Sequence, residues 1–328
     1  MRIGFDLHGT DLAPRAELEA LDLIRLEPIE GCEIVPIGKV GLESEIKGRG
    51  FPFIIAEDVV GMHEIPSVAV RRKRQSTMAI GMQLLKEKKL DAFISAGNTG
   101  ALFGFARLIL GKIEGVSRPG IGVPFPSEKG YCLLIDVGAN LNASSVDLYQ
   151  YGIMGSIFAR TVMGIKRPKV GLLNIGEEYT KGNESMRRTY SLLHKSSLNF
   201  VGNIEGGDLM KGYCDVVVTN GFVGNILLKF AEGFAATVGN LFQKAIESAV
   251  RRKVGAVFIR SALSEVKGRL NYEEYGGGIL LGLPQTVVLA HGRSSAAALR
   301  SAVKMAEQCA KSDLSGLIYG AFQENDGG

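Results

Sequence analysis

Apolar residues are distributed along the chain in two alternating patterns, short and nearly continuous runs and longer segments of helical periodicity. Continuous apolar character is typical of strands covered on both faces, so the short runs predict a mostly parallel sheet in an α/β protein. The predicted strands are Arg2–Leu7, Asp91–Ser95, Tyr131–Val137, Lys169–Ile175, Asn199–Ile204, Cys214–Thr219 and Gln285–Ala290. The predicted helices are Ala16–Ile24, Ser76–Lys88, Thr99–Leu110, Met154–Met163, Asn225–Arg251 and Ser294–Lys311.

One structural unit is expected over residues 1–328. The length suits one large α/β unit, and neither an internal repeat nor a low-complexity linker divides the chain. Residues from about 226 to 275 are predicted to form a basic, helical appendage to the sheet. The segment Lys112–Lys129 contains Pro119, Pro124 and Pro126 and is predicted to be a loop excursion.

The composition excludes several classes of protein. Hydrophobic residues make up 46% and charged residues 22% of the chain, which excludes general disorder. A net charge of only +4, no tryptophan and 7% aromatic residues argue against nucleic-acid binding. The four cysteines form no CxxC motif, the N-terminus has no signal peptide, and no apolar run reaches 18 residues. We therefore expect a cytoplasmic protein of a reducing compartment.

The 43 glycines gather in turns that follow the predicted strands, where ligands bind in open α/β sheets. The turn SAGNTG at 95–100 and the turn NGFVGN at 220–225 each lead into a predicted helix, and helix N-termini favour anions. Two such turns in one parallel sheet favour a composite phosphate site. The alternative is structural, because glycine turns with an asparagine cap need no ligand. The substrate-binding candidates are Ser95, Gly97, Asn98, Thr99, Gly100, Asn140, Asn183, Asn220, Gly221 and Gly224.

Candidates for the chemistry lie in three loops. Lys181 follows a predicted strand and could offset the charge of a phosphate or an oxyanion. His8 and Asp11 close the first strand together with Asp6, where they could act as a base, orient one or bind a metal, although Asp11 also suits a helix cap. Asn225 is placed to cap the helix that it precedes. No nucleophile motif and no metal-spaced Cys/His set occurs, which favours direct transfer between bound reactants.

Two basic segments suggest partners. The run Arg71, Arg72, Lys73 and Arg74 could hold an acidic carrier protein or a phosphate, or could be a solvated charge run. Between positions 251 and 269, six basic residues accompany an apolar stripe at Ile259, Leu263, Val266 and Leu270. Such an amphipathic helix could lie on an anionic membrane or pack against a partner subunit.

An ordered series of motifs resembles the PlsX family, the phosphate acyltransferases of bacterial phospholipid synthesis. The resemblance extends from residue 1 to about residue 310. Its motifs are SAGNTGAL at 95–102, DVGAN at 136–140, LLNIG-E…KGNE at 172–184, VGNIEG-D at 201–208, NGF-GN-LLK at 220–229, YGGG-LLG at 275–282 and HG-SSA at 291–296.

The resemblance implies a three-layer α/β/α fold like that of phosphate acetyl/butyryl transferases and isocitrate/isopropylmalate dehydrogenases, usually in a homodimer. It implies transfer of a fatty acyl group from acyl carrier protein to orthophosphate, with no metal and no organic cofactor. The acyl phosphate would then serve a membrane glycerol-phosphate acyltransferase. Lys181 and Asn225 would stabilise the phosphate or the tetrahedral oxyanion.

The sequence departs from the family pattern in two loops. The first loop of the family usually is D-x-M-G-G-D, and here His8 and Thr10 replace the methionine and a glycine. The later loop usually is D-G-F-T-G-N, and here Asn220 and Val223 replace the aspartate and the threonine. His8 is a candidate replacement base. These departures keep open a catalytically degenerate paralogue that acts as a carrier or membrane scaffold. A decarboxylating dehydrogenase on the related fold is a further alternative.

Overall fold

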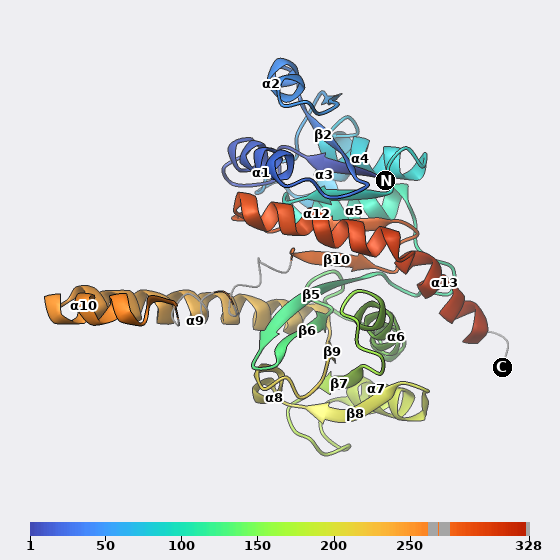
Figure 1. Ribbon diagram of the computed structural model, residues 1–328. Helices are drawn as coiled ribbons and strands as arrows, with labels where there is room; N and C mark the ends of the chain where they lie inside the picture. Colours follow the sequence, from blue (N-terminus) through green and yellow to red (C-terminus); the bar gives the residue numbers. More distant parts are fainter. Residues whose placement is uncertain (262–267, 269–275, 326–328) are drawn as a thin grey trace.

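The computed structural model describes residues 1–261, 268 and 276–325. Within them, eleven strands form a single sheet in the order β3-β2-β1-β4-β11-β10-β5-β6-β9-β7-β8 (Figure 1). The strands are β1 (Arg2–Asp6), β2 (Glu33–Lys39), β3 (Ile54–Ala56), β4 (Ala92–Ser95), β5 (Gly120–Ser127), β6 (Gly130–Ile135), β7 (Lys169–Leu173), β8 (Asn199–Ile204), β9 (Val216–Val218), β10 (Gly278–Leu281) and β11 (Thr286–Leu289).

The sheet reverses direction at its centre. Strands β3, β2, β1, β4 and β11 are mutually parallel, as are β6, β9, β7 and β8. Between these two sets, β10 is antiparallel to β11 and to β5, and β5 is antiparallel to β6. Three successive reversals make the two parallel sets run in opposite directions. Their carboxyl ends therefore lie at opposite edges of the sheet.

Helices cover both faces of the sheet over two buried apolar clusters, which confirms the predicted three-layer α/β fold. One face carries α1 (Arg15–Leu26), α2 (Glu43–Gly48), α6 (Ser145–Thr161), α7 (Glu184–Lys195), α12 (Ala296–Lys311) and α13 (Leu314–Asn325). The other carries α3 (Pro66–Arg72), α4 (Thr77–Lys86), α5 (Thr99–Ile109), α8 (Gly206–Met210) and the first turns of α9 (Gly221–Glu247).

Four strands were not predicted, and one of them contradicts a prediction. Strand β5 occupies Gly120–Ser127, within the proline-containing segment Lys112–Lys129 that was expected to be a loop. Its prolines are tolerated because β10 pairs only with residues 120–122, so that Pro124 and Pro126 pair on one side, with β6. Proline, which has no N–H, is tolerated where a strand pairs with a neighbour on one side only. Strands β2, β3 and β10 were missed as well.

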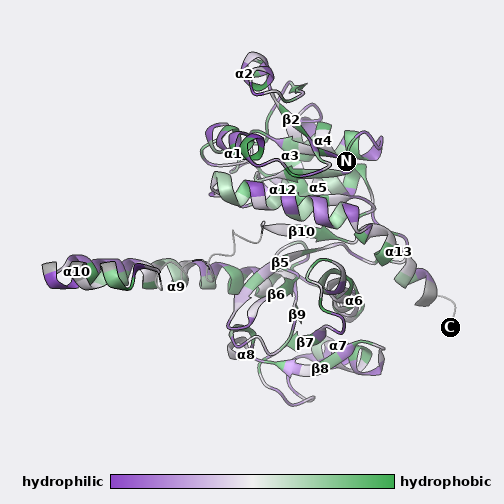
Figure 2. Ribbon diagram, in the orientation of Figure 1, coloured by the Kyte–Doolittle hydropathy of each residue, from purple (hydrophilic) through white to green (hydrophobic). Residues whose placement is uncertain are grey.

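The predicted appendage is an arm formed by α9 and α10 (Val250–Phe258), which projects from the body (Figure 1). Helix α9 begins at Gly221, earlier than predicted, because Asn220 rather than Asn225 is its N-cap. Hydrophobic residues recur along the arm (Figure 2). Of the predicted stripe, Ile259 is half-exposed, whereas Leu263, Val266 and Leu270 lie outside the described residues.

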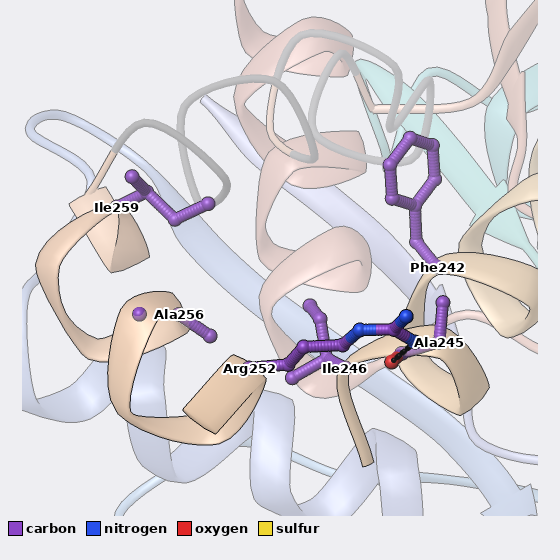
Figure 3. A pocket seen from close by; sticks show the side chains of 7 residues that line it. Phe242, Ala245, Ile246, Arg252, Ala256 and Ile259 are labelled. Atoms are coloured by element: carbon purple, nitrogen blue, oxygen red, sulfur yellow. Dashed lines mark hydrogen bonds between the residues drawn. The ribbon is translucent and has the colours of Figure 1, made fainter. Parts of the chain in front are cut away.

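A hollow of about 350 Å³ lies between the outer end of α9 and α10 (Figure 3). Among the described residues that line it, Arg252 is the charged one, and its side chain turns back onto α9, where it donates to the carbonyl oxygen of Ala245 at 3.1 Å and to Ser248 Oγ at 2.8 Å. The other described lining residues are glycine or apolar, and the hollow lies far from the polar loops. In the described part of the chain, no helix combines the length and the apolar character needed to span a bilayer.

Candidate active site

The predicted site residues fall into two groups, one at each edge of the sheet. The loops after β1, β4 and β11 share one edge, and the loops after β6, β9, β7 and β8 share the other. The SAGNTG and NGFVGN turns therefore follow strands of opposite direction, because the sheet reverses between them. The predicted composite phosphate site stays a prediction.

At the first edge, a buried carboxylate connects two strands. Asp6 accepts a hydrogen bond from Ser95 Oγ at 2.7 Å and another from the backbone N–H of His8 at 3.0 Å. Burial raises the pKa of Asp6, although both hydrogen bonds act in the opposite direction. Ser95, a predicted phosphate ligand, is fully buried and thus holds β4 to β1.

The two departures in the first loop, His8 and Thr10, both form hydrogen bonds within the fold. His8 Nε2 accepts from the backbone N–H of Lys39 at 3.0 Å, which ties this loop to the end of β2. Thr10 donates from its N–H at 2.8 Å and from Oγ1 at 3.0 Å to the buried carboxylate of Glu17. Since Nε2 is occupied, a neutral His8 carries its proton on Nδ1 and has no free lone pair to act as a base.

The SAGNTG turn uses its asparagine structurally. Asn98 Oδ1 accepts from Ala101 N–H at 3.0 Å and caps α5, and its Nδ2 donates to the carbonyl oxygens of Met62 and Glu64. Gly97 is buried, whereas Thr99 and Gly100 are exposed at the start of α5. This turn therefore presents to solvent the side chain of Thr99 and the backbone of Thr99 and Gly100 at the start of α5.

Helix α9 brings the two edges into electrostatic contact. His291, in the loop after β11, is partly buried, and burial lowers its pKa while Glu232 of α9 raises it. Its Nδ1 accepts from the N–H of Arg293 at 3.1 Å. Asn225 stands seven residues before Glu232, about 10 Å along the helix axis. The first three turns of α9 thus extend from one group of loops to the other.

At the second edge, the carboxylate of Asp136 organises the DVGAN loop. It accepts four backbone N–H groups, from Ile121, Gly138, Ala139 and Asn140, at 2.7–3.1 Å. Burial raises the pKa of Asp136, against the effect of these hydrogen bonds.

The start of α9 packs directly on this carboxylate. A Cβ on Gly221 would stand 2.8 Å from Asp136 Oδ2, and one on Gly224 would collide with the carbonyl oxygen of Asp136. Asn220 Oδ1 accepts from Val223 N–H at 2.9 Å. Asn225, one residue after Gly224, is exposed beside Gly138. The two glycines are therefore required by the close approach of helix and loop.

Asn140 serves the scaffold. It is buried, and its Nδ2 donates to the carbonyl oxygen of Pro119 at 2.7 Å and to Tyr151 Oη at 2.8 Å. Its own carbonyl oxygen accepts from Gly221 N–H at 2.9 Å. Asn183 caps α7 by accepting from Met186 N–H at 3.0 Å.

Lys181 is the predicted catalytic lysine at this edge. It lies in the loop between β7 and α7, and its side chain is about half exposed, with Nζ 3.8 Å from Glu178 Oε1. Lys181 and Asn225 are therefore the predicted catalytic side chains that this edge presents to solvent. At the other edge, Asp11 is exposed as well.

The basic run near α3 is divided by the structure. Arg71, Arg72 and Arg74 are exposed. Lys73 is instead bound within the protein, with Nζ 2.6 Å from the carbonyl oxygen of Val59 and 2.8 Å from Glu64 Oε1, and its bond to Glu64 raises its pKa. Three arginines, not four basic residues, form the cationic surface.

Asp136, Asn203 and His291 were not among the predicted site residues. Each lies in one of the family motifs, DVGAN, VGNIEG or HG-SSA, and each motif directly follows or ends a strand. That position was the available signal. Among the described residues, no three His, Cys, Asp or Glu side chains gather in a way that could hold a metal ion.

Solved structures with a similar fold include phosphotransacylases. A phosphotransacetylase from Streptococcus pyogenes superposes with a TM-score of 0.62 at 15% identity, over 95% of this chain and 94% of that one. A branched-chain phosphotransacylase from Enterococcus faecalis V583 gives a TM-score of 0.60 at 12% identity, over 94% of this chain and 99% of that one. The fold is thus the one predicted, that of the phosphotransacetylases.

The sequence comparisons define the family. The family model described as "Fatty acid synthesis protein" matches residues 1–316. The phosphate acyltransferase of Desulfitobacterium hafniense (strain DSM 10664 / DCB-2) is 42% identical over 323 residues, which cover 95% of each chain. That of Brevibacillus brevis is 40% identical over 334 residues, covering 99% of this chain and 98% of the relative. The chain belongs to this family, the PlsX family of phosphate acyltransferases, and is an acyltransferase; the predicted resemblance is confirmed.

His8 should make the stability of the protein depend on pH. Burial lowers the pKa of His8 below its ordinary value of 6.5, despite the opposing effect of Asp6. The unfolded chain therefore binds more protons than the folded one as the pH falls through 6.5, and stability decreases there. Urea unfolding of the wild type and of His8→Met between pH 5 and pH 8 measures this effect. We expect the wild type to lose more stability toward pH 5 than His8→Met, and parallel profiles would contradict this account.

Proposed function

We propose that this protein transfers a long-chain fatty acyl group from acyl carrier protein to orthophosphate, producing an acyl phosphate for phospholipid synthesis. Membership of the phosphate acyltransferase family supports acyl transfer to phosphate. The observation that carries the proposal is the edge where Lys181, Asn225 and the N-terminus of α9 are exposed around the loops after β6, β9 and β7.

This edge provides the electrostatics that the reaction needs. An oxygen of orthophosphate forms a new bond to the thioester carbonyl carbon, the C–S bond breaks, and the carrier leaves as a thiol with the proton that the hydrogen phosphate gives up. Lys181 would neutralise charge on the phosphate or on the tetrahedral oxyanion, and Asn225 would donate a hydrogen bond to it. Positioning the two reactants side by side supplies the rest of the rate enhancement without a covalent enzyme intermediate.

The carrier protein would dock on α3. Exposed Arg71 and Arg72 lie one to two turns after Ile65 and Val68, which are 65% and 41% exposed. An apolar contact flanked by arginines fits an acidic partner. Through Asn98, which bonds the carbonyl oxygens of Met62 and Glu64, this surface is joined to the loop after β4.

The arm would pair with the arm of a second copy. Phe222, Ile226, Phe230 and Phe234 recur every four residues on α9, and each is more than half exposed. An apolar stripe of this size is typical of a helix that is buried in an oligomer. Farther out, exposed Phe258 and Ile259 stand near Arg251, Arg252 and Arg260, a composition that suits peripheral contact with an anionic membrane. Co-sedimentation with anionic vesicles measures that contact.

Replacement of Lys181 tests its proposed role in the transfer of the acyl group. Purified protein, long-chain acyl-carrier protein and orthophosphate should yield acyl phosphate that hydroxylamine traps. Lys181→Ala should lower kcat/KM by roughly 100-fold, the usual effect of removing one donor to an oxyanion. Lys195→Ala, an exposed lysine at the end of α7, is the matched control and should behave as wild type. Carrier binding without any acyl phosphate would favour the scaffold alternative.

Charge reversal on α3 tests whether the carrier protein docks there. The double variant Arg71→Glu/Arg72→Glu should raise KM for the acyl-carrier substrate roughly tenfold at low salt, because it reverses the charge of the docking surface. KM for phosphate should stay unchanged. Arg160→Glu, which reverses an exposed arginine on α6 across the sheet, is the control. An equal rise in both Michaelis constants would speak against docking at α3.

Charged substitutions in the apolar stripe of α9 test whether the arm forms the interface of a dimer. Light scattering coupled to size-exclusion chromatography should give a dimer for the wild type and a monomer for Phe230→Glu/Phe234→Glu. Both side chains are exposed in the single chain, so the variant should fold normally, as circular dichroism can verify. Gln243→Glu adds charge on the opposite side of α9 and should remain dimeric. A dimeric double variant would place the interface elsewhere.

A further inference from the structure

The loop that carries Lys181 is connected to a neighbouring strand by one buried side chain. The loop leaves β7 at Asn174 and enters α7 at Glu184. Glu177, Glu178, Tyr179, Thr180 and Lys181 are exposed, so the outer part of the loop has little apolar packing of its own. Its position therefore depends on hydrogen bonds to its backbone.

Asn203 of β8 supplies two of these bonds. Its Nδ2 donates to the carbonyl oxygen of Glu178 at 2.9 Å and, more weakly, to that of Glu177 at 3.5 Å. The side chain is only 6% exposed. In turn, the carbonyl oxygen of Glu178 accepts from Lys181 N–H at 3.0 Å. One carbonyl thus joins Asn203 to the backbone of Lys181.

Asn174 and Gly182 anchor the other side of the loop. Asn174 Nδ2 donates to the carbonyl oxygen of Lys181 at 3.2 Å, and its Oδ1 accepts from Ile175 N–H at 2.9 Å. Gly182 has a φ of +83°, and a Cβ there would stand 2.7 Å from Asn174 Oδ1. Lys181 is therefore fixed from both sides, by Asn203 through Glu178 and by Asn174 directly.

The position of Asn203 carries an uncompensated polar atom. Its Oδ1 is buried and has no hydrogen-bond partner in the described part of the chain. A buried acceptor without a donor destabilises the folded state, and an apolar side chain of similar size would remove that penalty. Packing alone does not favour asparagine here. What asparagine provides, and leucine does not, is the pair of N–H donors to the loop.

We propose that Asn203 is a positioning residue that holds the loop 175–183 so that Lys181 faces the reactants. The proposal rests on the proposed function for the role of Lys181, but the ordering of the loop does not. Asn203 itself contacts no substrate and acts through the backbone of Glu178. The VGNIEG motif thereby gains a function.

Cleavage by trypsin after Lys181 tests loop order without any substrate. Asn203→Leu and Asn203→Ala remove both donors, and we expect cleavage at the Lys181–Gly182 bond, followed by mass spectrometry, to become at least roughly tenfold faster as the loop opens. Asn199→Ala is the matched control, because Asn199 lies on the same strand and donates to the carbonyl oxygen of Arg167, away from this loop. It should be cleaved at the wild-type rate. Unchanged cleavage in both Asn203 variants would overturn the proposal.

Kinetics separate positioning from folding. Thermal melting should show Asn203→Leu to be at least as stable as wild type, while its kcat/KM falls roughly 10–100-fold, as expected when a reacting group is misplaced. In a Lys181→Ala background, Asn203→Leu should have little further effect, because the group that it positions is gone. Fully additive losses, or loss of activity only in proportion to loss of folded protein, would refute the proposal. Should the wild type form no acyl phosphate, the proposed function fails while the trypsin experiment still decides the role of Asn203.

Discussion

Most of the second half of the structure depends on the hydrogen bonds that the buried carboxylate of Asp136 accepts. Four backbone N–H groups converge on it from the start of β5 and from the DVGAN loop. Each buried donor left unpaired costs about 1–3 kcal/mol, so no neutral side chain could replace it without loss. Because the carboxylate lies beneath Gly221 and the backbone carbonyl of Asp136 lies beneath Gly224, the start of α9 has room only for glycine at these two positions. The direction of α9, and with it the whole arm, follows from this contact.

The reversal of the sheet gives α9 a second role. A sheet of one strand direction would collect all its glycine turns at one edge, whereas here β10 and β5 send the two halves in opposite directions. Without a connecting element, the loops around Asp6 and those around Asp136 would form two separate groups at opposite ends of the strands. Helix α9 starts in the second group and reaches Glu232 beside His291 of the first. The arm therefore begins among the loops of the second group and passes those of the first before it leaves the body.

The sequence predicted the α/β class, seven of the strands and the positions of the glycine turns, because buried strands and tight turns leave strong local patterns. It missed β5 since its prolines break the local pattern, and only the partial overlap with β10 makes them acceptable. It did not show that the two turns follow strands of opposite direction, because strand direction depends on the order of strands in the sheet, which is not a local property. The removal of Lys73 from the cationic surface was equally invisible, as its partners Val59 and Glu64 are defined by tertiary structure.

Most polar side chains around the site serve the backbone. The side-chain amide groups of four asparagines cap a helix or bond a buried carbonyl oxygen: Asn98, Asn140, Asn183 and Asn220. Because these residues have structural roles, the fold tolerates the departures from the family pattern in the later loop. Asn220 caps α9 through an oxygen, the same kind of acceptor that an aspartate offers, and Val223 contributes to the cap only its backbone N–H. The two substitutions thus leave the start of α9 and its cap intact, and what they remove from this turn is a carboxylate charge and a hydroxyl. Under the proposed function, an effect on the reaction would arise in the chemical step or in substrate binding, and not in the architecture of the turn.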